Sequence, residues 1–115
     1  MNFIGRNLLS MADMSPDEIA ELLYQARAIK TGRETPNLQG KSLGMIFEKP
    51  SLRTRVSFTV AMNQMGGSCL DLGKEIGIGS REPFEDVMMV LARYFDVLAM
   101  RTYTQKRLED LAGVA

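Results

Sequence analysis

Hydrophobic positions along the chain follow two spacings, which separate helical segments from extended ones. In four stretches apolar residues recur at intervals of three and four, the pattern of an amphipathic helix with one buried face. These stretches begin near Ser15, Ser51, Glu82 and Thr104. Short apolar runs typical of buried strands lie at 42–47, 68–72 and 96–100. A helix followed by three strand–helix units predicts the α/β class, a three-layer domain with a parallel sheet and crossover helices.

Capping residues and glycines mark where the helices begin and end. Ser15 precedes a proline, and Glu18 stands three residues after the serine, which is the arrangement of a capping box. Glycine at the end of an apolar-periodic stretch is typical of a helix stop. We therefore expect the first helix to end near Gly32, the second at Gly66-Gly67 and the last at Gly113.

Each later helix has a set of apolar residues that we expect to face the sheet. They are Phe58, Ala61, Met62 and Met65 in the second helix, Phe84, Val87, Met88 and Leu91 in the third, and Leu108, Leu111 and Ala112 in the last. Cys69 lies in an apolar run and is expected to be a buried strand residue rather than a reactive thiol. With a single cysteine and no histidine, the chain is expected to hold no zinc site.

The junction between the first strand and the second helix concentrates anion-binding side chains. Residues 47–58 read Phe-Glu-Lys-Pro-Ser-Leu-Arg-Thr-Arg-Val-Ser-Phe. At a helix N-terminus the backbone N–H groups lack intrahelical acceptors, and the helix dipole favours negative charge. Ser51 and Thr54 add hydroxyl donors, and Arg53 adds a planar fork that suits phosphate oxygens. A phosphate pocket is predicted here, and the alternative on spacing alone is a capped helix with solvated arginines.

A second candidate, Arg101, stands at the end of the third predicted strand. In open parallel sheets the carboxyl ends of the strands share one edge, where ligands gather. We therefore expect Arg101 and Ser51 to meet at that edge, close enough to converge on one small ligand. Taken alone, Arg101 also fits a surface arginine that follows a strand.

Length, charge and the absence of histidine exclude several classes of protein. A chain of 115 residues forms one domain at most, and its 14 basic side chains are balanced by 14 acidic ones. That balance gives no general attraction to nucleic acid or to an anionic membrane, so we expect neither as a partner. A Ser-His hydrolase site and a His-ligated metal site are excluded within this chain. No membrane span or signal peptide is recognisable, and a cytoplasmic location is expected.

The anion-binding run resembles the carbamoyl-phosphate motif of the aspartate/ornithine carbamoyltransferase family. Phe-Glu-Lys-x-Ser-x-Arg-Thr-Arg followed by Val-Ser-Phe carries the resemblance, and Lys49 favours the ornithine branch. The glycines at 66–67 and the segments 96–103 and 108–112 also fall where the family's N-terminal domain has them. The resemblance implies that residues 1–115 are a truncated carbamoyl-phosphate-binding domain without the amino-acid-binding domain. The family's His-Pro-x-Gln motif would then follow after residue 115.

The resemblance implies a role for each residue of the predicted site. Arg53 and Arg101 are the implied catalytic residues. Carbamoyl phosphate would be bound by Ser51, Leu52, Arg53, Thr54 and Arg101. Leu52 departs from the commoner threonine, which removes one hydroxyl donor but keeps the backbone N–H. Arg55 matches an arginine that is mainly structural in the family.

The glycine-rich loop at 73–80 is a weaker signal. Its Gly77-Ile78-Gly79 lacks the third glycine and the strand–helix context of a nucleotide fingerprint, so on sequence alone the loop fits a flexible connector. By resemblance the loop reaches into the site of a neighbouring subunit of a homotrimer, through Ser80 and Arg81. Residues 86–89 depart from the family's Asp-Thr-Ala-Arg, so a family salt bridge lacks its arginine here.

The activity implied by the resemblance is transfer of the carbamoyl group from carbamoyl phosphate to the amine of ornithine, giving citrulline and phosphate. This acyl transfer needs no cofactor and belongs to arginine biosynthesis. We expect the 115 residues alone to be inactive, because the missing domain binds the amine. Three alternatives stay open. They are a fold fragment that only binds phosphate-like anions, a different phosphate-binding α/β enzyme, and a carbamoyltransferase for aspartate, acetylornithine or putrescine.

Overall fold

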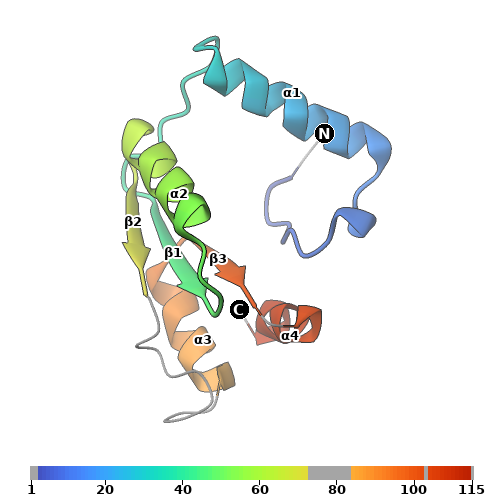
Figure 1. Cartoon of the computed structure of the whole chain (residues 1–115), viewed down its shortest axis with the longest axis vertical. Helices are drawn as coiled ribbons and strands as arrows, with labels where there is room; N and C mark the ends of the chain where they lie inside the picture. Colours follow the sequence, from blue (N-terminus) through green and yellow to red (C-terminus); the bar gives the residue numbers. More distant parts are fainter. Residues whose placement is uncertain (1–2, 73–83, 103, 115) are drawn as a thin grey trace. The chain divides into compact units, whose positions relative to one another are not determined.

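The structure, a computed structural model, describes residues 3–72, 84–102 and 104–114 of the chain. The chain divides into two compact units, Met1–Pro36 and Asn37–Ala115. Figure 1 labels the helices and strands of both units.

The first unit contains the 3-10 helix Met11–Asp13 and the helix α1, Pro16–Lys30. The predicted capping box is present: Ser15 Oγ accepts from the Glu18 N–H at 3.1 Å, and Glu18 Oε1 accepts from the Ser15 N–H at 3.0 Å. Arg6 donates to the second carboxylate oxygen of Glu18. The Arg6 hydrogen bond, followed by the capping contact, lowers the pKa of Glu18 to about 2. The start of α1 is thus confirmed as the sequence predicts it.

The second unit is built on three parallel strands. They are β1 (Ser42–Phe47), β2 (Ser68–Asp71) and β3 (Val97–Arg101). β1 lies in the middle, so the strand order is β2-β1-β3. Phe47 pairs with Arg101, which brings the carboxyl ends of β1 and β3 together. The three predicted strands are confirmed, with shifts of one residue at the end of β2 and at both ends of β3.

One face of the sheet packs against α2, which runs over Leu52–Gln64 (Figure 1). The odd-numbered positions of β1, Leu43, Met45 and Phe47, are buried on this face, and Met62 of α2 packs against them. Because these side chains alternate along the strand, the remaining positions of β1 point to the opposite face.

The opposite face packs against α3 (Phe84–Tyr94) and α4 (Gln105–Val114). Ile46 of β1, Met88 of α3 and Leu111 of α4 form the buried cluster there, and Met88 is fully buried. β1 is therefore covered on both sides, as expected for the middle strand of a parallel sheet. The predicted three-layer α/β class is confirmed. Among the helices that the structure describes, none is long and apolar enough to cross a membrane.

Of the predicted inward residues of α2, Met62 packs against the sheet as expected and Ala61 and Met65 are partly buried, but the prediction for Phe58 is wrong. Phe58 is 40% exposed instead of facing the sheet. Arg55 and Thr59 are less exposed, because β2 offers both of them partners: Arg55 lies 3.5 Å from Asp71 Oδ2, and Thr59 Oγ1 lies 3.9 Å from Cys69 Sγ. Hydrophobic spacing predicted an inward Phe58, but Arg55 and Thr59 are the less exposed residues of this turn.

Two other boundaries of the second unit can be compared with the sequence. Gly113 does not stop the last helix, because α4 continues to Val114. The expected start of the third helix near Glu82, and the packing of the Phe84 side chain, lie outside the described residues. Cys69 lies in the strand β2, as expected, but it is partly buried instead of fully buried.

The predicted glycine stop of α2 is a Schellman motif. Gly66 has a φ of +85°, and its N–H donates to Asn63 O at 3.2 Å. The Gly67 N–H donates to Met62 O at 2.9 Å, which completes the motif. A Cβ on Gly67 would lie 2.6 Å from Met62 Cε and 3.3 Å from Leu38 Cβ. The glycine pair therefore ends α2 closely packed and leads directly into β2.

Candidate functional site

The junction between β1 and α2 lies at the carboxyl edge of the sheet, beside the end of β3. Ser51 is 7% exposed, and its Oγ accepts a hydrogen bond from Arg101 Nη1 at 2.8 Å. Arg101 is the last residue of β3, and its backbone C=O accepts from the Glu48 N–H at 2.9 Å. The prediction that Ser51 and Arg101 share one sheet edge is confirmed.

Ser51 precedes α2 but does not cap it with its side chain. Its Oγ makes no cap hydrogen bond to the first turn of the helix. A serine hydroxyl offers one donor and two acceptor positions, and the bond from Arg101 uses an acceptor position. The side-chain-capped helix is therefore wrong for this position. The hydroxyl keeps its own proton to donate at the sheet edge.

The first turn of α2 combines backbone donors with a positive charge. Leu52, Arg53 and Thr54 are exposed, and the structure's described residues provide no hydrogen-bond or ion-pair partner for the Arg53 or Thr54 side chain. The N–H groups of a first turn lack intrahelical acceptors, and Ser51 Oγ caps none of them. The structure thus gathers the predicted residues into one donor-rich corner next to Arg101. Their role in ligand binding stays a prediction.

Arg53 and Arg55 have different surroundings, as their spacing predicts. The Arg53 side chain is exposed at the start of α2. The Arg55 side chain is partly buried, and its Nη1 lies 3.5 Å from Asp71 Oδ2 at the end of β2. Arg55 therefore connects α2 to the sheet, while Arg53 is directed to solvent.

An ion pair beside this corner was not recognised from the sequence. Glu48 follows β1 directly, its side chain is 11% exposed, and its Oε2 accepts from Arg107 Nη1 at 2.8 Å. Arg107 lies in the first turn of α4, where Thr104 Oγ1 accepts from the Arg107 N–H at 3.3 Å. A carboxylate that immediately follows a buried strand was the only sequence signal for this pair.

The loop residues Ser80 and Arg81, predicted by resemblance to reach a neighbouring subunit, lie outside the described residues. The same holds for the whole glycine-rich segment at 73–80.

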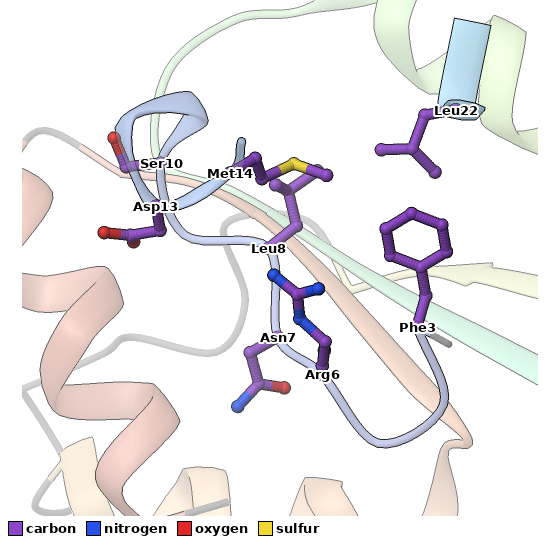
Figure 2. A pocket seen from close by; sticks show the side chains of 8 residues that line it. All are labelled: Phe3, Arg6, Asn7, Leu8, Ser10, Asp13, Met14 and Leu22. Atoms are coloured by element: carbon purple, nitrogen blue, oxygen red, sulfur yellow. The ribbon is translucent and has the colours of Figure 1, made fainter. Parts of the chain in front are cut away.

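The first unit contains a small hollow of about 140 Å³ (Figure 2). It is lined by Phe3, Arg6, Asn7, Leu8, Ser10, Asp13, Met14 and Leu22. In Figure 2 Phe3 points toward Leu22, and Leu8 toward Met14, and these four apolar side chains share the lining with four polar or charged ones. Arg6, the cation of this hollow, is already paired with Glu18. With Arg6 paired to Glu18 and the Asp13 carboxylate also in the lining, the hollow is a weaker candidate for an anion site than the sheet edge.

Comparison with known proteins identifies the family. The family model described as "Aspartate/ornithine carbamoyltransferase, carbamoyl-P binding domain" matches residues 6–115. The ornithine carbamoyltransferase of Halalkalibacterium halodurans is 48% identical over 116 residues, covering 96% of this chain and 36% of that protein. The chain therefore belongs to the aspartate/ornithine carbamoyltransferase family, and the resemblance drawn from its motif is confirmed.

Solved structures agree with this assignment. The ornithine carbamoyltransferase of Pyrococcus furiosus superposes with a TM-score of 0.89 at 41% identity, over 100% of this chain and 38% of that one. The enzyme of the same name from Gloeobacter violaceus has a TM-score of 0.82 at 46% identity, over 94% of this chain and 35% of that one. The chain thus spans somewhat more than a third of the length of these relatives.

Proposed function

We propose that the sheet edge at Ser51 and Arg101 binds carbamoyl phosphate, and that the protein transfers the carbamoyl group to ornithine. The observation that carries this proposal is the Ser51–Arg101 hydrogen bond of 2.8 Å beside a helix start that has no side-chain cap. Membership of the carbamoyltransferase family supports it, as do the relatives named ornithine carbamoyltransferase.

The phosphate group would lie at the start of α2. The first-turn N–H groups point along the helix axis toward an anion, and the helix dipole favours its negative charge. Arg53 adds a guanidinium fork, and Ser51 adds its O–H. Leu52 contributes its backbone N–H alone, because its side chain carries no donor. This arrangement binds phosphate as the leaving group without a metal ion.

The carbonyl end of carbamoyl phosphate would then extend toward Arg101 and Thr54. The neutral amine attacks the carbonyl carbon, and the C–O bond to the phosphate breaks. The nitrogen loses one proton, which ends on the departing phosphate, so that the products are the carbamoylated amine and hydrogen phosphate. Negative charge develops on the carbonyl oxygen during the attack, and preorganised donors stabilise it most when they are fixed beforehand. Arg101 is fixed in this way, because it already donates to Ser51. No covalent intermediate with the protein is needed.

In this proposal residues 1–115 form the carbamoyl-phosphate-binding domain, and the groups that orient the amine lie outside these residues. The names of the relatives favour ornithine as the acceptor. The reaction would produce citrulline for arginine biosynthesis in the cytoplasm. The complete enzyme would be a homotrimer, with Ser80 and Arg81 directed to a neighbouring site. The basis for these finer points is the family resemblance.

Replacing Arg53 by alanine tests the phosphate site. We expect phosphate or carbamoyl phosphate to bind about 1.5–3 kcal/mol more weakly, the scale of a hydrogen bond to a charged group. That corresponds to roughly ten- to a hundredfold in Kd by titration calorimetry. Arg93→Ala, which removes an exposed arginine near the end of α3, is the matched control and should change the Kd little. Equal affinities in Arg53→Ala and the parent chain would refute the site.

A further inference from the structure

Glu48 and Arg107 join two segments that carry the proposed site. Glu48 lies in the segment from β1 to Ser51, and Arg107 lies in the helix that follows Arg101. Their ion pair, of 2.8 Å, adds to the Glu48 N–H bond to Arg101 O and to the Arg101 bond to Ser51. Three contacts of different kinds therefore tie the end of β1 to the end of β3 and the start of α4.

A carboxylate at this position needs an explanation. Glu48 is only 11% exposed, and in the part of the chain that the structure describes its Oε1 is buried without a hydrogen-bond partner. A buried carboxylate oxygen without a partner is costly, and an apolar pair of similar volume would hold two elements together as well or better. The negative charge of Glu48 also opposes an anion bound a few residues further along the chain. Packing and charge both disfavour this residue, so a geometric role is the remaining explanation.

We infer that Glu48 and Arg107 are positioning residues that set the separation between the Ser51 segment and Arg101. This inference rests on the proposed function. Carbamoyl phosphate would contact both segments, its phosphate at the start of α2 and its carbonyl at Arg101. Inorganic phosphate needs only the start of α2. The ion pair therefore affects the ligand that bridges the two segments and leaves the smaller anion nearly unaffected.

The direction in which Glu48→Gln changes the affinity for carbamoyl phosphate distinguishes a positioning role of Glu48 from a purely electrostatic one. Replacing Glu48 by glutamine keeps the size of the side chain and removes its negative charge. If the charge alone mattered, both anions would bind more tightly, because a repulsive carboxylate is gone. If Glu48 positions the segments, carbamoyl phosphate binds more weakly in spite of the more positive site.

The test compares the two ligands in the full 115-residue chain. Titration calorimetry measures the Kd of carbamoyl phosphate and of inorganic phosphate for the parent, Glu48→Gln, Arg107→Met and the double variant. We expect Glu48→Gln and Arg107→Met each to weaken carbamoyl phosphate about tenfold and inorganic phosphate less than about twofold, with no further loss in the double variant. Arg107→Lys, which keeps the charge, should recover part of the loss. Glu109→Gln, an exposed substitution on the same helix, should match the parent.

Three outcomes would overturn the inference. Equal losses for both ligands would show that the pair only supports the fold, and tighter binding of both would show that only the charge acts. Additive losses in the double variant would show that the two residues do not act as a unit. If Glu48→Gln unfolds, the Arg107→Lys and Arg107→Met chains decide by the same comparison of ligands. A parent chain that binds phosphate but not carbamoyl phosphate would overturn the proposed function as well, which separates the two failures.

Discussion

The purified 115-residue chain should form no citrulline above background from carbamoyl phosphate and ornithine. It contains no histidine, and it spans only somewhat more than a third of the ornithine carbamoyltransferases that it matches. Holding two reactants in the correct orientation contributes about 7–11 kcal/mol to an enzymatic rate. In the proposed function the amine-orienting groups lie outside these residues, so the rate should fall by roughly 10⁵- to 10⁸-fold.

A colorimetric citrulline assay measures this directly. The ornithine carbamoyltransferase of Halalkalibacterium halodurans, assayed at the same concentration, serves as the positive control. Turnover by the 115-residue chain at a rate comparable to that control would contradict the proposal that the amine-orienting groups lie outside these residues. It would mean that the residues described above orient the amine as well.

Replacing Arg101 by alanine should weaken carbamoyl phosphate by about 3 kcal/mol, the upper end for hydrogen bonds to charged groups. The substitution removes the guanidinium that would contact the carbonyl oxygen, and it also removes the donor that orients the Ser51 hydroxyl. Because one change removes two functions, the Kd should rise by roughly a hundredfold. Titration calorimetry with carbamoyl phosphate measures the change.

Arg55→Ala is the matched control for this substitution. Arg55 is directed to Asp71, so its loss should affect the packing of α2 against β2 more than the affinity for the ligand. Thermal unfolding should register Arg55→Ala more strongly than the calorimetric Kd does. A larger loss of affinity in Arg55→Ala than in Arg101→Ala would place the ligand elsewhere.

The positions of the strands could be predicted from the sequence because buried parallel strands are short, continuous apolar runs, whereas the order β2-β1-β3 was not predicted. Helix ends could also be predicted where local hydrogen bonds determine them, as at the Ser15 capping box and the Gly66-Gly67 Schellman motif. The exposure of Phe58 in α2 could not be predicted from the sequence. It accompanies the contacts of Arg55 with Asp71 and of Thr59 with Cys69, and local spacing carries no information about contacts with β2.

Some features of the candidate site could likewise be predicted from the sequence, and others could not. That Ser51 and Arg101 share an edge follows from the rule that parallel strands end on one side of a sheet, and the hydrogen bond between them confirms it. The orientation of the Ser51 hydroxyl did not follow, because a serine before a helix usually caps it. The Glu48–Arg107 pair joins residues 59 positions apart, and local spacing carries no information about such a contact.

We propose that one small ligand lies between the start of α2 and Arg101. Titration of the ¹⁵N-labelled chain with carbamoyl phosphate, followed by two-dimensional NMR, tests it most directly. We expect the backbone amides of residues 52–54 and the guanidinium signals of Arg53 and Arg101 to shift together with one Kd. Shifts confined to the hollow between Phe3 and Leu22, or none at residues 52–54 and Arg101, would contradict it.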